Sequence, residues 1–230
     1  MDGPDREASS LVLMTGLRAA MGPELEFEAS LPVSWLNARD GAVEEEKSGT
    51  GDLLTRVHLS RNLGHWTLGA SAGVYWPVSN LDGAGLPEVA TFVSGTIDPV
   101  LGMGISGGLW SGIDVGLFSS ARLVVSDFED GRRLGSTFTT TASIRHVVSR
   151  KLSLQGLVTH FHRQTDTGNM MEDSGGDWIY LQPQAAWKVA ASGSRAWQFL
   201  MGLRLPVHQN VRGTQLVDSP SFLAGLSVTM

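Results

Sequence analysis

The sequence predicts an all-β protein, an antiparallel up-and-down β-barrel that spans a membrane. Three observations predict this fold. Apolar and polar residues alternate with a period of two along nearly the whole chain, which is typical of strands with one apolar face. The alternating runs are roughly 10–14 residues long, which suits tilted membrane-crossing strands better than the shorter strands of soluble sheets. The connections between the runs alternate between short and long, as in outer-membrane barrels.

Composition excludes several other classes of protein. The chain has 230 residues, of which 42% are hydrophobic and 17% charged, with a mean hydropathy of +0.01 and a formal net charge of −6. This composition argues against disorder, and the acidic balance gives no support for a nucleic-acid partner. The lack of cysteine excludes disulfides and cysteine-bound metals. No apolar run reaches the ~18 residues of a transmembrane helix, and the polar stretch from Met1 to Glu7 shows no signal peptide.

Six alternating runs occupy the first half of the chain, and each is expected to form one strand of a single domain, 1–230. In the second run, the apolar residues Phe27 and Leu31 alternate with Glu26 and Glu28. The fourth run is apolar at every even position from Trp66 onward, with small or polar residues between. The expected strands are 9–21, 24–37, 51–61, 64–77, 96–109 and 112–126.

Five further runs complete the chain and bring the total to eleven. The seventh run has a wholly polar face from Thr137 to Arg145, and the ninth alternates apolar residues such as Leu181 with Gln182. The last run sets Phe222 and its apolar neighbours against small and polar residues. The expected strands are 134–148, 151–164, 177–190, 195–208 and 219–230.

The connections orient the predicted barrel. The short ones are 22–23, 62–64, 110–112, 149–150 and 191–194, and the long ones are 37–50, 78–95, 127–133, 165–176 and 209–218. Barrels of this kind have short periplasmic turns and long external loops. The long connections hold more than half of the acidic residues. These residues are either simply solvated or recruit divalent cations that bridge to lipopolysaccharide, and both interpretations stay open.

An odd number of runs is unexpected, because bacterial single-chain barrels have even strand numbers. The last run follows a long loop and therefore descends toward the periplasm, and the first run descends as well. We therefore expect about twelve strands, of which eleven are visible in this sequence and the leading strand is missing.

Tryptophan placement supports a membrane barrel. All seven tryptophans fall at or near the ends of the expected strands, where amphipathic rings lie at headgroup level. The expected interface girdle consists of Trp35, Trp66, Trp76, Trp110, Trp178, Trp187 and Trp197.

The polar faces carry charged side chains that would point into the barrel. The expected lumen-lining residues are Glu26, Glu28, Arg56, His58, Asp114, Arg122, Arg145, Lys188 and Arg204. They either line a passage that selects small solutes or form a plug of paired charges, because buried charge must be paired. For any individual residue we favour the paired network.

Two histidines are a weak candidate for a metal site. His160 and His162 lie two residues apart on the lipid-side face near the external rim. Because zinc requires further ligands that this pair lacks, we expect interfacial histidines, no metal and no other cofactor. The chain also has no His-Glu-x-x-His, Gly-x-Ser-x-Gly or phosphate-binding motif, so we expect no enzymatic activity.

Several short motifs lie in order along the chain: Leu31-Pro32-Val33, Ser48-Gly49-Thr50-Gly51-Asp52, Gly95-Thr96-Ile97-Asp98-Pro99-Val100-Leu101-Gly102, Gly175-Gly176 with Leu181-Gln182-Pro183, and Gly213-Thr214-Gln215-Leu216. Together these motifs resemble the family of outer-membrane transport proteins named for the meta-pathway of phenol degradation. One departure is Pro77-Val78-Ser79, where the family tends to have Pro-Thr-Gly.

The resemblance implies a small porin-like barrel in the Gram-negative outer membrane that takes up hydrophobic or aromatic compounds. The expected function is therefore a channel or transporter for passive uptake of small molecules. Its expected partners are outer-membrane lipid, lipopolysaccharide and a small-molecule solute. The alternative is a plugged structural barrel that anchors an envelope protein or forms a subunit of a larger envelope complex.

Overall fold

The described residues form one antiparallel sheet. The structure is a computed structural model that describes residues 6–40, 43–79, 96–125, 127, 133–168, 175–192, 195–212 and 220–229. The described strands are β1 (Arg6–Ala20), β2 (Leu25–Asp40), β3 (Val43–Thr50), β4 (Leu53–Leu63), β5 (Trp66–Trp76), β6 (Asp98–Trp110), β7 (Ile113–Arg122), β8 (Thr137–Val147), β9 (Leu152–Arg163), β10 (Gly176–Ser192), β11 (Arg195–Val211) and β12 (Ser221–Thr229). Within these ranges we find no helix long and apolar enough to cross a membrane.

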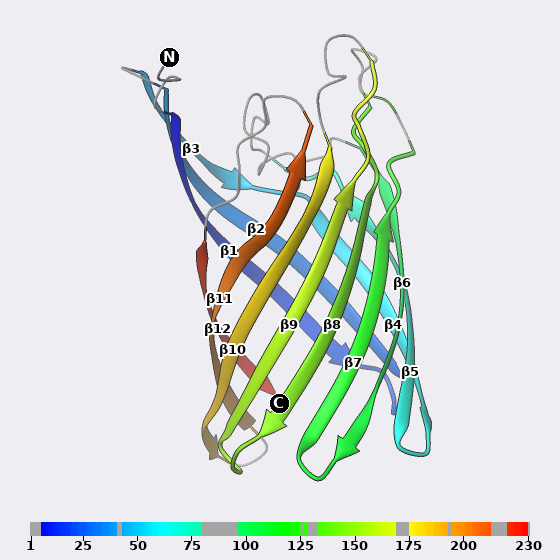
Figure 1. Ribbon diagram of the computed structural model, residues 1–230. Coiled ribbons are helices and arrows are strands. Elements are labelled where there is room, and N and C mark those ends of the chain that lie inside the picture. Colours follow the sequence, from blue (N-terminus) through cyan, green and yellow to red (C-terminus); the bar gives the residue numbers. More distant parts are fainter. Residues whose placement is uncertain are drawn as a thin grey trace.

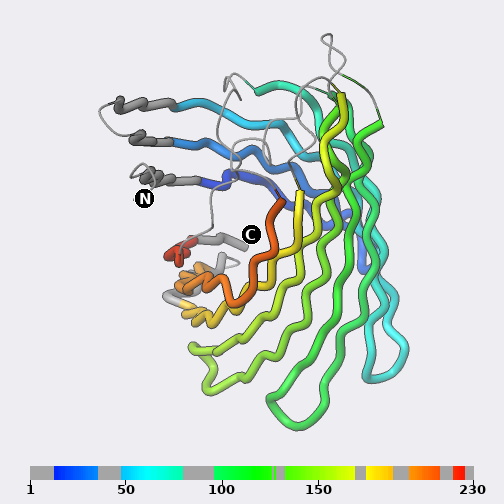
Figure 2. Tube along the Cα trace, turned by 45° about the horizontal axis from the view of Figure 1, so that its top comes forward, coloured from blue at the N-terminus to red at the C-terminus, as the bar shows by residue number. Residues whose placement is uncertain are grey.

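The sheet follows chain order and curls into a barrel-like shape with tilted strands (Figures 1 and 2). The hairpins β4–β5, β6–β7 and β8–β9 lie together at one end, which we call the short-turn end; the opposite end is the long-loop end. Two of these turns contain a glycine with positive φ, Gly64 at 66° and Gly112 at 78°. Tight two-residue hairpins require such backbone conformations, which glycine adopts at little cost.

Strands β3 and β4 form a single pass across the sheet. β3 pairs with β2 from Val33 to Asp40, and β4 pairs with the same strand from Leu25 to Ser30. The strand is interrupted between them at Gly51 and Asp52. The twelve strands therefore make eleven passes, at the positions of the eleven predicted runs. The antiparallel all-β fold with about twelve strands is confirmed.

One expected loop is wrong in part. The segment 37–50 was expected to be a long connection, but β2 continues to Asp40 and the chain returns as β3 from Val43. Backbone pairing between these strands persists although the side chains are charged, because the ladder depends on main-chain groups and not on the apolar pattern. The expected loop 78–95 lies outside the described residues from position 80 onward.

The sheet has its apolar face on the outside. On β6 and β7, Met103 is 70% exposed and Leu117 is 49% exposed. Their neighbours Gly104 and Phe118 lie on the opposite, less accessible face. A contiguous apolar exterior of this extent on a soluble protein would be an aggregation surface, whereas in a lipid bilayer it is the favoured arrangement. The sheet is therefore built for a membrane.

The two faces of the sheet should respond differently to a charge. Leu117→Lys places an ammonium on the outer face, and we expect it to destabilise the folded barrel by about 2–4 kcal/mol near the bilayer centre. Gln184→Lys, on the inner face of β10 opposite Gln155, should cost much less. Urea unfolding in lipid vesicles, followed by tryptophan fluorescence, measures both. Equal destabilisation by the two variants would contradict the assignment of the faces.

Candidate functional site: the inner face of the barrel

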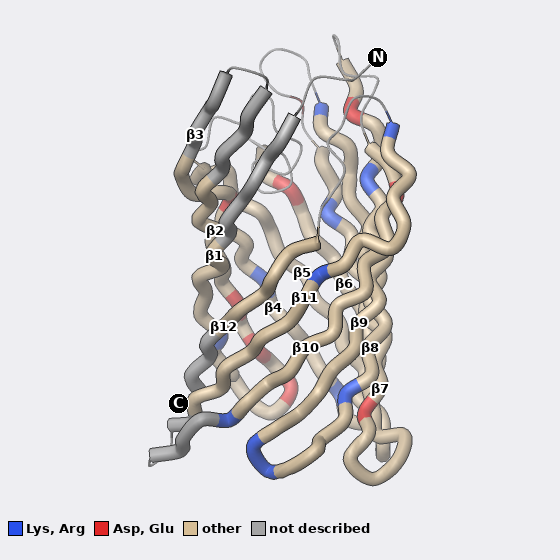
Figure 3. Tube along the Cα trace, turned by 60° about the vertical axis from the view of Figure 1, so that its left-hand side comes forward, with Lys and Arg blue, Asp and Glu red and all other residues tan. Residues whose placement is uncertain are grey.

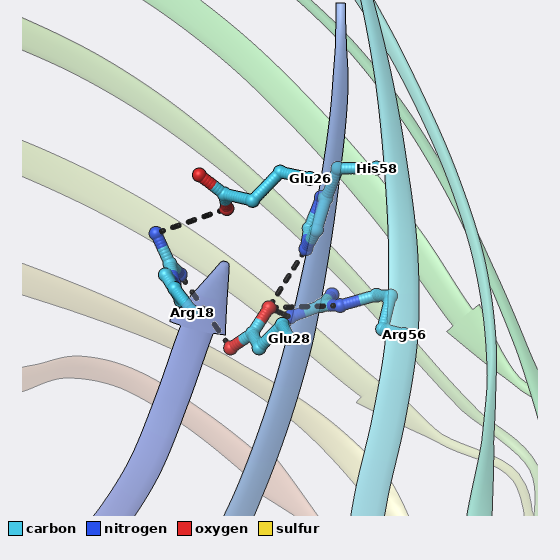
Figure 4. A network of polar contacts seen from close by, with 5 residues as sticks. All are labelled: Arg18, Glu26, Glu28, Arg56 and His58. Atoms are coloured by element: carbon cyan, nitrogen blue, oxygen red, sulfur yellow. Dashed lines mark hydrogen bonds and ion pairs between the residues drawn. The ribbon is translucent and has the colours of Figure 1, made fainter. Parts of the chain in front are cut away.

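Glu28 is the centre of an ion network on the inner wall (Figure 4). Its Oε2 accepts hydrogen bonds from Arg56 Nη2 at 2.9 Å and Nε at 3.3 Å, and lies 2.7 Å from His58 Nε2. Its Oε1 lies 3.5 Å from Arg18 Nη2, and Arg18 Nη1 lies 3.8 Å from Glu26 Oε1. We call these five residues the Glu28 network. Its two carboxylates and two guanidinium groups balance in charge.

Strand register brings this network together. Arg18 on β1 and Arg56 on β4 are the direct cross-strand partners of Glu28, and Glu26 is the partner of His58. Directly opposed residues on one face of a sheet have closely spaced Cβ atoms. The ladder alone therefore places the two guanidinium groups on either side of the Glu28 carboxylate.

Arg122 is the centre of a second network, at the long-loop end of β7. Its Nε donates to Asp98 Oδ2 at 2.9 Å, and its Nη2 lies 3.5 Å from Asp52 Oδ2. Its guanidinium carbon stands 4.2 Å from the ring centroid of Tyr75, and the Thr96 hydroxyl donates to Asp98 Oδ1 at 2.7 Å. Asp52 and Asp98 are fully buried. The Arg122 network thus ties β5, β6 and β7 to the segment before β4.

Aromatic and cation–π contacts also join the strands β9, β10 and β11 toward the long-loop end. The guanidinium carbon of Arg204 lies 3.7 Å from the ring centroid of Tyr180, and the rings of Phe161 and Trp178 are 5.5 Å apart. Trp178 and Tyr180 are buried. These contacts join β9, β10 and β11 on the inner face.

A short loop is also fastened at this end. Arg163 Nη2 donates to both oxygens of Asp166, at 2.8 and 2.7 Å, and the Gly135 amide donates to Asp166 Oδ1 at 2.6 Å. Both side chains are buried. The buried residues on the inner side of the sheet thus gather toward the long-loop end, which is the more closely packed end.

The remaining expected lumen residues lie nearer the short-turn end. Asp114 on β7 and Arg145 on β8 are direct cross-strand partners, and Lys188 on β10 is exposed. The nearby β8–β9 turn is basic, with Arg150 and Lys151 (Figure 3). The nine expected lumen residues alternate along their strands with the residues of the outer face. Whether they line a passage or form a plug stays a prediction, which the experiments below test.

Two of the tryptophans expected in the girdle lie elsewhere than predicted. Six of the seven expected rings are exposed, with values from 39% at Trp66 to 69% at Trp110. Trp178 is only 6% exposed, because it lies on the inner-facing side of β10 together with Tyr180. Trp35 also lies inside a strand, since β2 extends five residues beyond it.

The histidine pair contacts a carboxylate. His160 Nε2 and His162 Nδ1 lie 3.1 and 2.9 Å from Asp177 Oδ1, on the outer side at the start of β10. Within the described ranges, no group of three or more His, Cys, Asp or Glu residues is arranged to hold a metal ion. Their role as interfacial histidines stays a prediction.

A cavity lies between the inner faces of β4 to β9. Its volume is about 500 Å³, and it occupies the middle and the short-turn half of these strands. Its lining on the inner face includes five hydroxyl side chains, two apolar side chains and one imidazole. The hydroxyls belong to Ser60, Thr67, Ser106, Thr141 and Ser143, the apolar side chains to Phe118 and Leu157, and the imidazole to His58.

Glycines make room for this cavity. The Phe118 ring lies over the backbone of Gly102 and Gly104, where an added Cβ would come within 2.8 and 2.9 Å of ring carbons. At Gly69, which also lines the cavity, an added Cβ would meet nothing closer than 3.9 Å. Gly104 therefore keeps the Phe118 ring flat against the wall, and Gly69 does not have this role.

An apolar exterior, a polar interior and a cavity inside an antiparallel sheet define a membrane β-barrel protein. The crystal structure of an outer membrane channel from Pseudomonas putida F1 has the same fold, with a TM-score of 0.69, 16% sequence identity, and coverage of 97% of this chain and 85% of that chain. The comparison with curated proteins found no match.

The chain belongs to the family described as "Putative MetA-pathway of phenol degradation", whose model matches residues 6–212. The family expected from the motifs is therefore confirmed.

Sequence reasoning missed several members of the two networks. Arg18 stands on the inward-facing side of the first run, and that periodicity is a signal that could have found it. Asp52 is the last residue of the family motif at 48–52, and Asp98 lies within the most distinctive motif, at 95–102. The structure brings both motifs together at Arg122.

Loss of the Arg122 guanidinium should leave two buried carboxylates without their common partner. We expect Arg122→Met to destabilise the barrel by about 3–5 kcal/mol, whereas Asp52→Asn/Asp98→Asn/Arg122→Met should recover most of that loss. Urea titration in vesicles measures all three proteins, including the wild type. A fully stable R122M variant would show that the network does not brace the strand ends.

The two glycines provide a matched pair. Gly104→Ala should cost about 1–3 kcal/mol, because the new methyl group meets the Phe118 ring and the Leu117 carbonyl. Gly69→Ala should stay within about 0.5 kcal/mol of the wild type. The same unfolding assay separates the two, and equal stabilities would refute the packing described for Phe118.

Proposed function

We propose that the protein is an outer-membrane channel through which small molecules pass passively. The cavity between β4 and β9 carries this proposal, because it provides space inside a sheet whose outer face suits lipid. Its volume of about 500 Å³ falls within the range of about 300–1,000 Å³ that is typical of small-molecule sites.

The position of the charges supports passage. In the Glu28 network, each contact joins adjacent strands of one wall. Arg122 likewise reaches along the wall, over β6 and β5, to Asp52. Charges paired in this way strengthen the wall and leave the middle of the barrel to solute or water.

The proposal includes a bacterial outer-membrane location, with lipid and lipopolysaccharide around the barrel. It also includes a substrate class of small molecules with apolar character, which the family description and the Phe118 and Leu157 side chains in the cavity support. The alternative, a plugged barrel that anchors an envelope partner, draws on the burial of Asp98, Arg122 and Tyr180 at the long-loop end.

Solute flux tests the proposal. Proteoliposomes that contain the purified barrel should take up labelled arabinose much faster than protein-free liposomes. Thr141→Trp/Ser143→Trp should lower this uptake at least about tenfold, because the two large rings take up much of the space in the cavity that both residues line.

Leu101→Trp/Met103→Trp, which adds two rings to the outer face of β6 at residues that do not line the cavity, is the matched control and should leave uptake unchanged. No uptake above the protein-free background by the folded wild-type barrel would overturn the channel and favour the plugged barrel.

A further inference from the structure

We infer that the cavity selects small uncharged solutes and disfavours ions of either sign, and that the Glu28 network sets this selectivity. The inference rests on the proposed channel function and adds the charge class of the solute. It follows from the lining of the cavity, from the pairing of the charges beside it and from the hydrogen-bonding groups that face it.

The lining contains one ionisable side chain, His58, among the described residues around the cavity. Its Nε2 lies 2.7 Å from Glu28 Oε2, so the imidazole already has an anionic partner. The remaining lining side chains are hydroxyls, small residues and apolar groups. An ion that leaves water for this cavity loses hydration and finds no opposite charge to replace it.

The neighbouring charges cancel one another. Arg18 and Arg56 face Glu26 and Glu28 at 2.9–3.8 Å, so these two guanidinium groups and two carboxylates leave no excess charge on the wall next to the cavity. Glu28 is central to this balance, since its carboxylate contacts both guanidinium groups. Loss of its charge would leave a cationic wall, and loss of a guanidinium would leave an anionic one.

An uncharged solute does find partners. The Thr141 hydroxyl pairs with Thr159 at 3.0 Å, and the Ser143 hydroxyl donates to the Gly116 carbonyl at 3.5 Å. A hydroxyl that donates one hydrogen bond keeps acceptor capacity. A solute with its own hydroxyl or amide groups can therefore exchange hydrogen bonds with water for hydrogen bonds with this wall, at little net cost.

Three tracers of similar size test the inference: neutral arabinose, the arabinonate anion and the choline cation. Uptake into proteoliposomes is measured with the membrane potential held at zero by potassium and valinomycin. We expect the wild-type barrel to admit arabinose at least about tenfold faster than either ion. Rapid uptake of arabinose with equally rapid uptake of an ion would overturn the inference and leave the channel intact. Failure of arabinose uptake would instead overturn the channel itself.

Variants of the network should shift the selectivity in opposite directions. Glu28→Gln should raise the arabinonate-to-arabinose ratio about tenfold, and Arg18→Gln should raise the choline-to-arabinose ratio. Glu26→Gln is the matched control for Glu28→Gln. Glu26 is more exposed, and among the described residues its one ion pair is with Arg18, at 3.8 Å, so its effect should be smaller. Ratios that stay at the wild-type value in both test variants would show that the network does not set the selectivity. If one variant fails to fold, the opposite shift expected of the other still decides the matter.

Discussion

The backbone hydrogen-bond ladder between neighbouring strands is the interaction on which the whole molecule depends. A lipid environment offers no partner for a main-chain amide or carbonyl, so each strand has to find its partners in the strands beside it. Pairing in turn fixes which residues stand opposite one another. The row Arg18, Glu28 and Arg56 is a direct product of this register, and so is the separation of apolar and polar side chains between the two faces.

Much of the fold could be predicted from the sequence, because a period of two identifies a strand wherever one face meets lipid. The signal fails where lipid ends. In the segments 36–40 and 43–50 the apolar alternation gives way to polar and charged residues, so the pattern predicts a loop, yet the main chain continues to pair. Trp178 fails for a different reason. It lies near a strand end, as a girdle residue should, but the alternation of β10 places its side chain on the inner face, where it is buried.

The candidate site was only half accessible to sequence reasoning. Charged residues within alternating runs, such as Glu28 and Arg56, could be placed on the inner face by counting. Asp52 could not, because it lies in a break between strands and meets Arg122 from three passes away. The resulting molecule is closely packed and ionically braced at the long-loop end, while its cavity lies toward the short-turn end.

The glycines in the wall of the cavity allow the width of the passage to vary independently of the strand number. Strand number and tilt set the circumference of a barrel, and side chains take up the space within. Where a wall is built from glycine, the ladder remains intact while the free radius is as large as the backbone permits. Related barrels could therefore widen or narrow their passage by exchanging single small residues at positions equivalent to Gly69, without any change in strand number. An engineered pore of graded diameter could begin from the same wall.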